Sequence, residues 1–210
     1  MLEFKVVFMG EMNFVENPLN ILQNHPLVLA SMSPRRNELL KQMGIHALLH
    51  PVNIDETPAL NEEPDIYVNR MSFEKYVQAV REVGSAEFVL TADTIVVLDN
   101  KILLKPDDEN HAKTMLGQLS GKTHHVLTSM CLGRGDQFKQ AISVSEVTFS
   151  QLNQSQINRY VQSKEPLDKA GSYGIQGLGA AFVSHLNGSY SGVMGLDVNI
   201  FYKLASLFNH

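Results

Sequence analysis

The stretch LVLASMSPRRNELLKQMG, residues 27–44, carries the strongest structural signal in this chain. Four apolar residues precede the turn Ser-Met-Ser-Pro, and an amphipathic run follows, which is typical of a buried strand that leads into a helix. Ser33 suits the N-cap, Pro34 suits the first helical position and Gly44 suits the residue just past the end. We therefore expect a strand, a tight turn and a helix.

Two arginines stand at the unfavourable end of that helix. Arg35 and Arg36 lie in the first turn, where the helix dipole favours acidic side chains and a capping box would place Glu or Gln at position 36. A strand that leads into a helix N-terminus leaves free backbone N–H groups, and two guanidinium groups with the hydroxyl of Ser31 add further donors. The turn suits an oligophosphate, and a pair of solvated surface arginines is the alternative.

The composition narrows the class of protein. The chain has 210 residues, 44% hydrophobic and 19% charged, with a net charge of −5, so nothing in the overall balance indicates a nucleic-acid partner. No apolar run reaches the roughly 18 to 20 residues that a membrane span needs. The single cysteine, Cys131, cannot form an intramolecular disulfide and favours a reducing compartment. We expect a cytoplasmic protein with no membrane and no nucleic-acid partner.

The chain divides into an extension and one domain. Residues 1–26 are expected to be an extension, either native or an expression remnant. They do not match a secretory signal, because the apolar run is short and Glu11 and Glu16 interrupt it. Residues 27–210 are expected to form a single domain. There, apolar runs alternate with helical patterns, and residues 99–101 and 133–136 are hairpin signals. This pattern predicts an α/β fold with a mixed sheet rather than a purely parallel one.

Acidic side chains interrupt or end two predicted strands. Asp55 and Glu56 end a strand expected within residues 46–57, and Asp93 with Thr94 lies inside the apolar run 88–98. A carboxylate among apolar residues is costly without partners. Carboxylates in such places hold Mg²⁺ with bridging phosphates or take a proton from water, and an aspartate that braces a turn is the alternative.

Single cations and a glycine-rich segment complete the candidate set. Lys75 lies in a helix expected to end at Gly84, Lys105 directly follows an apolar run, and Lys169 and Gln176 flank the glycine-rich loop. Each of these residues alone is typical of a surface, and the glycines suit either a ligand cradle or a plain turn. A strand at residues 180–186 and a closing helix that begins at Asp197 are expected after the loop.

Taken in order, six segments resemble the Maf family of nucleoside triphosphate pyrophosphatases. They are LASMSPRRNELLKQMG, NIDET, TADTIVVLDNKILLKP, LSGKTHHVLT, DKAGSYGIQGLGAAFVSHLNGSY and GVMGLDV. The forms SPRR, ADT and GIQG are similar to those of the subfamily that acts on dTTP and UTP. Asp197 stands where Pro is usual in that family, and we expect Asp197 to serve there as a helix N-cap.

The resemblance implies an activity, a cofactor and a fold. The activity is hydrolysis of a nucleoside triphosphate between the α and β phosphates to the monophosphate and pyrophosphate, a house-cleaning reaction that needs a divalent cation, Mg²⁺ or Mn²⁺. The implied fold is an elongated mixed sheet flanked by helices, with two lobes around a central cleft, as in Maf and inosine triphosphate pyrophosphatase-like proteins. The resemblance also suggests a homodimer.

The resemblance further implies roles for ten residues. Asp93 is the general base, and Glu56 and Asp93 are the metal ligands. The implied catalytic residues are Asp93, Glu56 and Lys105, and the implied substrate-binding residues are Ser31, Arg35, Arg36, Lys75, Thr94, Lys169 and Gln176. Of these, Arg35, Thr94 and Gln176 match positions linked to base selectivity.

Two other functions compete with this one. A non-catalytic nucleotide-binding regulator of septum formation would need the arginines without the acids. The retained Asp93 and Glu56 therefore favour an enzyme. A phosphatase that releases orthophosphate is not separated from a pyrophosphatase by the residues alone.

Overall fold

The structure is a computed structural model that describes residues 18–20, 22 and 25–208. Residues 1–17, 21, 23–24 and 209–210 lie outside the described residues, and with them most of the predicted extension. Leu19 and Leu22, at the described end of that extension, pack against a core that includes Phe201 and Leu204. Within the described part of the chain, no helix has both the length and the apolarity to cross a membrane.

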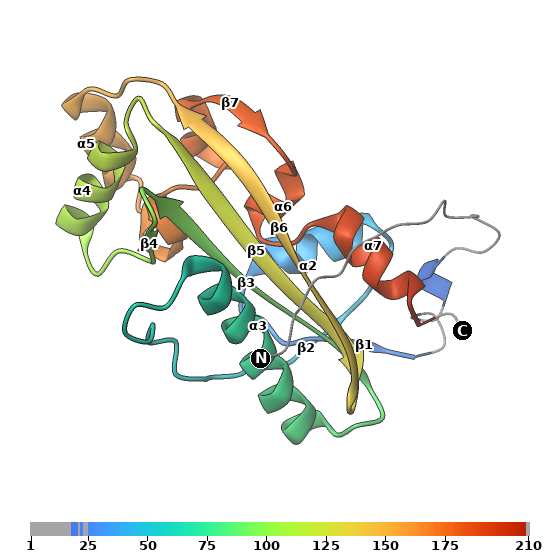
Figure 1. Ribbon diagram of the computed structural model, residues 1–210. Coiled ribbons are helices and arrows are strands. Elements are labelled where there is room, and N and C mark those ends of the chain that lie inside the picture. Colours follow the sequence, from blue (N-terminus) through green and yellow to red (C-terminus); the bar gives the residue numbers. More distant parts are fainter. Residues whose placement is uncertain (1–17, 21, 23–24, 209–210) are drawn as a thin grey trace.

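The described residues form one mixed seven-stranded sheet in the order β2-β1-β3-β5-β6-β7, with β4 paired to β3. The strands are β1 (Leu27–Leu29), β2 (Leu48–Leu49), β3 (Phe88–Leu98), β4 (Lys101–Leu103), β5 (Thr123–Arg134), β6 (Gln137–Phe149) and β7 (Val183–Asn187). β1 is parallel to β2 and β3, and all other pairs are antiparallel. The long β5 and β6 make the sheet elongated (Figure 1). The predicted mixed α/β fold is confirmed.

Helices cover both faces of this sheet (Figure 1). The α-helices are α2 (Pro34–Gln42), α3 (Pro64–Val83), α4 (Glu109–Leu119), α5 (Gln154–Gln162), α6 (Tyr190–Met194) and α7 (Val198–Ser206). The 3-10 segments are η1 (Pro18–Asn20), η2 (Glu165–Asp168), η3 (Ala170–Ser172) and η4 (Gly177–Phe182).

The predicted strand, turn and helix at residues 27–44 are confirmed as β1 and α2. Pro34 opens the helix, and Gly44 follows it with a φ of +76°, a conformation that glycine adopts without strain. Ser33 occupies the N-cap position, but its side chain forms no capping hydrogen bond. The first predicted hairpin is also confirmed, because Asp99 and Asn100 connect β3 to β4 with positive φ at both residues.

Side chains alternate along β3 and face two different layers. On one face, Tyr67, Val68 and Met71 of α3 pack with Ile95, and Ile54 of the connection after β2 also packs against this cluster. The opposite face carries two separate cores. One holds Leu90 and Ala92 with residues of α2, α6 and α7, and the other holds Val96 and Leu98 with residues of α4, α5 and the 3-10 segments. The predicted two lobes are these two cores.

Two local predictions need correction and a third is confirmed. The strand expected within residues 46–57 is limited to Leu48–Leu49, and the rest is an extended connection that leaves the sheet. The strand expected at 180–186 begins only at Val183, because residues 177–182 form a 3-10 helix. Asp197 caps α7 as expected, since its Oδ1 accepts hydrogen bonds from the backbone N–H groups of Asn199 and Ile200 at 3.0 and 3.2 Å.

Candidate active site

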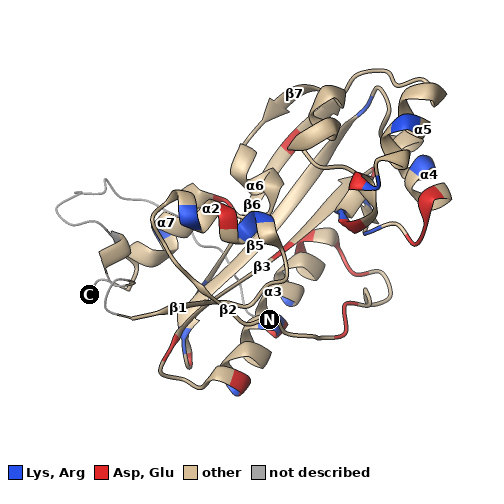
Figure 2. Ribbon diagram, turned by 180° about the vertical axis from the view of Figure 1, so that it is seen from behind, with Lys and Arg blue, Asp and Glu red and all other residues tan. Residues whose placement is uncertain are grey.

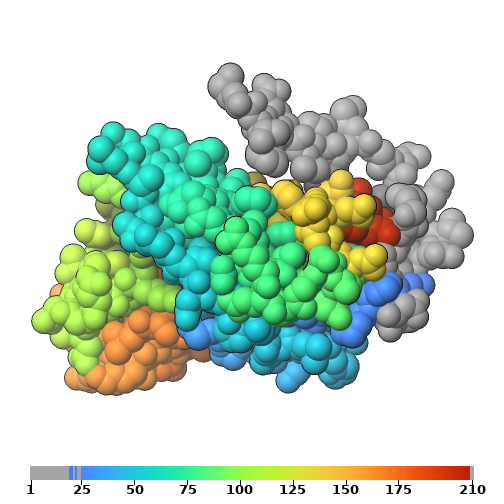
Figure 3. Space-filling model, turned by 90° about the horizontal axis from the view of Figure 1, so that it is seen from below, coloured from blue at the N-terminus to red at the C-terminus, as the bar shows by residue number. Residues whose placement is uncertain are grey.

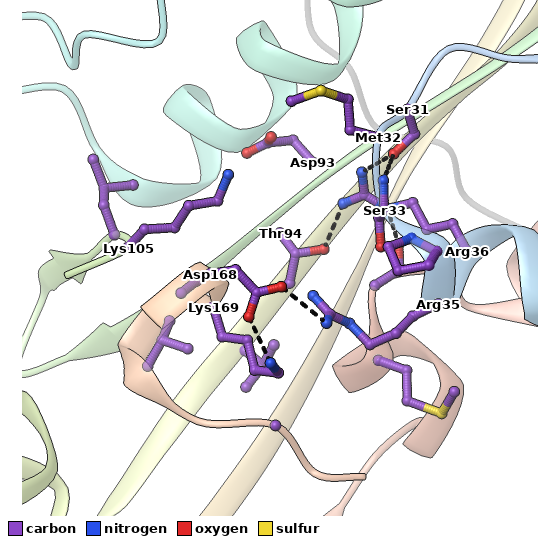
Figure 4. A pocket seen from close by; sticks show the side chains of 18 of the residues that line it. Ser31, Met32, Ser33, Arg35, Arg36, Asp93, Thr94, Lys105, Asp168 and Lys169 are labelled. Atoms are coloured by element: carbon purple, nitrogen blue, oxygen red, sulfur yellow. Dashed lines mark hydrogen bonds and ion pairs between the residues drawn. The ribbon is translucent and has the colours of Figure 1, made fainter. Parts of the chain in front are cut away.

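The candidate site lies where one edge of β3 has no partner strand. β1 pairs with β3 as far as Leu90, and β4 begins to pair at Val96, so residues 91–95 have no strand beside them on this edge in the described structure. A cavity of about 760 Å³ opens against this gap (Figure 4). Because successive side chains alternate, Asp93 points toward α3 and Thr94 toward the opposite layer. Both side chains reach the cavity at the gap.

The cavity brings together all ten residues that the sequence singled out. They are Ser31, Arg35, Arg36, Glu56, Lys75, Asp93, Thr94, Lys105, Lys169 and Gln176. They come from the start of α2, the connection after β2, the middle of α3, the gap in β3, the end of the β4 hairpin, and the loop after η2. Figure 3 shows the orange segment around residues 165–170 beside the blue and cyan segments that hold α2 and the connection after β2. Asp55 does not line the cavity; its Oδ1 accepts a hydrogen bond from the backbone N–H of Thr57 at 2.9 Å, so it braces a turn.

Lys75 bridges two carboxylates. Its Nζ lies 2.6 Å from Asp93 Oδ1 and 2.7 Å from Glu56 Oε1. The Lys75 and Asp93 side chains are 12% and 14% exposed, so this pair is largely shielded from solvent. Partial burial alone would raise the pKa of Glu56, but Lys75, Lys105 and Arg36 outweigh it and lower this pKa below its usual value. Glu56 is therefore held as a carboxylate.

Tyr67 fixes the backbone that carries Glu56. The buried Tyr67 on α3 donates a hydrogen bond from its hydroxyl to the Glu56 carbonyl oxygen at 2.8 Å. Burial, reinforced by the charges of Asp93 and Glu56, raises the pKa of Tyr67 well above its usual value, so its hydroxyl stays a donor. Tyr67 was not singled out from the sequence, because nothing local marks a tyrosine in a helix as the partner of a distant carbonyl oxygen.

Arg36 is tied to three elements, and it lies with Arg35 at the basic start of α2 (Figure 2). Its Nε donates to the Gly195 carbonyl oxygen at 2.8 Å, Nη1 to Ser31 Oγ at 2.9 Å, and Nη2 to Thr94 Oγ1 at 3.2 Å. Burial lowers the pKa of Arg36, and the charge of Asp93 partly offsets this effect. The guanidinium remains charged because its ordinary pKa lies far above neutral pH.

A second basic group faces Arg35 across the cavity. Arg35 Nη1 lies 3.6 Å from Asp168 Oδ2, and Lys169 Nζ lies 2.6 Å from Asp168 Oδ1 (Figure 4). Burial alone would raise the pKa of Asp168, but Lys169 and Arg35 lower it overall. Asp168 was not singled out from the sequence, because an acid next to a lysine is typical of an ordinary surface.

The glycine-rich loop is held from outside the cavity by Glu165. Its carboxylate accepts hydrogen bonds from the backbone N–H groups of Leu178 and Gly179 and from the Tyr160 hydroxyl, at 3.0, 3.1 and 2.9 Å. Although burial alone would raise the pKa of Glu165, these hydrogen bonds lower it. The Gln176 amide on this loop forms no side-chain hydrogen bond with any other described residue, so both of its polar ends are available to a ligand.

The charges of the cavity favour a polyanion. Five basic side chains line it (Arg35, Arg36, Lys75, Lys105 and Lys169), and three acidic side chains line it (Glu56, Asp93 and Asp168). The exposed Lys105 forms no ion pair with any other described residue. In a cavity with partly buried walls, such an excess of positive charge raises the local concentration of anionic ligands.

The model of the Maf-like protein family matches residues 26–208. The chain belongs to this family. A dTTP/UTP pyrophosphatase of Pectobacterium atrosepticum is 48% identical to this Maf-like protein over 172 residues, which cover 82% of this chain and 87% of the relative. A dTTP/UTP pyrophosphatase of Escherichia coli K12 is 45% identical over 183 residues, which cover 87% of this chain and 93% of the relative.

A solved structure gives only a weak likeness. The crystal structure of a nucleoside-triphosphatase / dITP/XTP pyrophosphatase from Mycobacterium abscessus matches 88% of this Maf-like protein and 100% of its own chain, with a TM-score of 0.43 and 12% identity. At that TM-score the likeness carries no argument about fold or activity.

The donor set of this Maf-like protein fits a divalent cation that is shared with phosphate. Glu56 and Asp93 both reach the same point, the Nζ of Lys75. Among the described residues, no group of three or more His, Cys, Asp and Glu side chains is placed to hold a metal ion alone. Mg²⁺ is commonly held by one or two carboxylates together with substrate phosphates. The two carboxylates therefore fit such a cation, with the remaining ligands supplied by the nucleotide and water.

Proposed function

We propose that this Maf-like protein is a nucleoside triphosphate pyrophosphatase that hydrolyses dTTP and UTP to the monophosphate and pyrophosphate. One observation carries the proposal. A single cavity combines an excess of basic side chains with two acids, Asp93 and Glu56, which both form ion pairs with Lys75. The substrates are those in the names of relatives that are 45 to 48% identical. The biological role is removal of non-standard or excess pyrimidine nucleotides.

Arg36 binds the phosphate chain. Three of its N–H groups, one on each guanidinium nitrogen, donate to protein oxygens. A guanidinium has five N–H donors, so one remains on each terminal nitrogen. These two donors suit phosphate oxygens, and Lys105 and Lys169 add charge to the same cavity. Positioning and charge stabilisation of this kind supply most of the catalysis in phosphoryl transfer.

Asp93 acts as the general base. It accepts the proton of the attacking water, and the ion pair with Lys75 Nζ at 2.6 Å holds its carboxylate in place. Glu56 and Asp93 would hold the divalent cation together with phosphate oxygens. When bound, that cation supplies charge neutralisation at the scissile anhydride. Mg²⁺ and Mn²⁺ both suit oxygen ligands of this kind.

Base selectivity rests on the side of the cavity formed by Arg35 and the glycine-rich loop. The Gln176 amide carries a donor and an acceptor that no other described side chain engages, which suits the edge of a pyrimidine. Arg35 lies at the same opening, and its ion pair is with the largely exposed Asp168. Homodimer formation and a cytoplasmic location, both expected from the sequence, stay predictions.

One experiment separates the enzyme from its alternatives. The protein is incubated with a panel of canonical and modified triphosphates and Mg²⁺ or Mn²⁺, and the products are identified by ³¹P NMR. We expect pyrophosphate from dTTP and UTP, with activity lost in Asp93→Asn and retained in Asp55→Asn, the matched change of an acid outside the cavity. Orthophosphate as the only product would indicate a phosphatase. Tight binding without turnover of any triphosphate would favour the septum-formation regulator.

A further inference from the structure

A closed set of hydrogen bonds surrounds the side chain of Arg36. On one side, Nη2 donates to Thr94 Oγ1 at 3.2 Å, Thr94 Oγ1 lies 2.9 Å from Thr128 Oγ1, and Thr128 Oγ1 donates to the Gly192 carbonyl oxygen at 2.8 Å. On the other side, Nε donates to the Gly195 carbonyl oxygen at 2.8 Å, and the Gly195 N–H donates to the Gly192 carbonyl oxygen at 2.9 Å. Both routes from Arg36 end on the same oxygen.

The direction of every hydrogen bond in this ring is fixed by chemistry. A guanidinium only donates and a carbonyl only accepts, while each threonine hydroxyl has a single proton. Thr128 gives its proton to Gly192, so Thr94 must give its proton to Thr128 and accept from Arg36. The Thr94 hydroxyl therefore has no proton left for a ligand while the ring is intact.

The sheet register places the two threonines. Thr94 and Thr128 are directly opposite each other in the antiparallel pair β3–β5. They lie on the face that carries the two cores, between Ala92 and Met130 of one core and Val96 and Val126 of the other. Thr128 is fully buried and does not line the cavity. It therefore acts on a ligand only through other residues.

Two glycines let α6 close the ring. A Cβ on Gly192 would lie 2.7 Å from Ser143 Oγ, so a larger residue there would force α6 or the Ser143 side chain to move. Gly195 has a φ of +113°, and a Cβ there would lie 3.3 Å from Arg36 Nε. The close contact between α6 and the sheet brings the Gly192 and Gly195 carbonyl groups within reach of Thr128 and Arg36.

We propose that Thr128 is a positioning residue for phosphate binding, which orients Arg36 through Thr94 on one side and through α6 on the other. This inference rests on the proposed function, in which Arg36 holds the phosphate chain. With the ring intact, the guanidinium plane is fixed before substrate arrives and two N–H groups are left for phosphate oxygens. Preorganisation of this kind increases affinity because less side-chain freedom is lost on binding.

The test compares three variants with the wild-type protein. Thr128→Val keeps the shape and removes the hydroxyl, and Thr128→Ser restores the hydroxyl. The matched control is Thr91→Val, because Thr91 is equally buried on β3 but on the opposite face, where its Oγ1 donates to the Ser72 carbonyl oxygen at 2.6 Å. For each protein, KM and kcat are measured with UTP, and the Kd of inorganic pyrophosphate is measured by calorimetry without turnover.

We expect Thr128→Val to raise the KM for UTP and the Kd for pyrophosphate about tenfold, with a much smaller change in kcat. Thr128→Ser and Thr91→Val should remain close to wild type in both. If Thr128→Val is not folded by circular dichroism, Thr94→Val breaks the same route at its other end, and the same rise is expected.

The outcomes separate this inference from the proposed function. Equal constants for Thr128→Val, Thr91→Val and wild type, with UTP turned over normally, would overturn the inference and leave the function standing. Absence of turnover in wild type, with the tenfold change in pyrophosphate affinity present, would overturn the function and support the inference. Absence of both turnover and pyrophosphate binding in wild type would overturn both.

Discussion

Lys75 Nζ and Asp93 Oδ1 lie 2.6 Å apart in a position that is largely shielded from solvent, and Glu56 reaches the same ammonium group. One cation thus keeps two carboxylates together on the α3 side of the cavity. Without it, the two acids repel each other, and the Asp93 carboxylate loses the contact that orients it.

Lys75→Met should therefore lower kcat/KM for UTP by about a hundredfold, the scale on which loss of one charged group at a phosphoryl-transfer site acts. Because Lys75 lowers the pKa of Glu56, its removal should also shift the acidic limb of the pH–rate profile to higher pH. Steady-state kinetics between pH 5 and 9 measure both effects. Lys101→Met, on the exposed part of β4 and outside the cavity, is the matched control. An unchanged profile in Lys75→Met would contradict this role.

The buried His124 predicts how stability depends on pH. It is 1% exposed, its Nε2 lies 2.8 Å from the Tyr173 hydroxyl, and its Nδ1 has no hydrogen-bond partner among the described residues. Burial lowers the pKa of His124 from 6.5 to about 4. The unfolded chain therefore binds a proton that the folded protein does not, and the free energy of unfolding falls as pH drops from 6.5 to 4.

At about 1.4 kcal/mol per pKa unit, this group removes on the order of 3 kcal/mol across that window. His124→Gln keeps a polar partner for Tyr173 and does not titrate, so its stability should fall less over the same window. Urea unfolding at pH 7, 5.5 and 4.5 measures the difference, and His185→Gln, at an exposed position on β7, is the control. Parallel pH dependence in wild type and His124→Gln would count against this prediction.

The exposed Lys105 predicts the salt dependence of substrate binding. Because it forms no ion pair with any other described residue, its charge is free to act on a phosphate chain, and salt screens such a charge. Lys105→Met should raise the KM for UTP several-fold at low salt and reduce the dependence of KM on salt concentration. Kinetics between 20 and 300 mM NaCl, about a fourfold range in Debye length, test this. Lys101→Met again serves as control, and equal salt dependence in both variants would contradict the prediction.

The sequence identified the cavity residues but not the contacts that orient them. The motif segments are collinear, so their residues were found without knowledge of the fold. The partners Thr128 and Asp168 were not found, because sheet register brings Thr128 to Thr94 and the fold of the chain brings Asp168 to Arg35, and neither contact leaves a local sequence pattern. Helix α6 was missed because it is short and contains Gly192, which lowers helical propensity and yet is what the close contact with β6 requires. The strand expected within residues 46–57 was too long, because Val52 and Ile54 line the cavity and only Leu48 and Leu49 pair in the sheet.

A final prediction concerns Gly195. Comparison with Gly44 separates the effect of backbone strain from the effect on the orientation of Arg36. Gly195 and Gly44 both follow helices with positive φ, +113° and +76°, but a Cβ at Gly44 would meet nothing within 4 Å. Gly44→Ala should therefore lose only the conformational cost of a positive φ, about 1 kcal/mol of unfolding free energy. A Cβ at Gly195 would also press on Arg36 Nε from 3.3 Å.

Gly195→Ala should consequently lose more stability than Gly44→Ala and should in addition raise the KM for UTP, whereas Gly44→Ala should leave KM unchanged. Urea unfolding and steady-state kinetics on the two variants give both quantities. A normal KM in Gly195→Ala would mean that Arg36 tolerates displacement of its carbonyl partner. The inference that the guanidinium is held in a fixed orientation would then be wrong, whatever the loss of unfolding free energy. A raised KM with only the strain cost of Gly44→Ala would mean that the Gly195 contact orients Arg36 without adding to the stability of the fold.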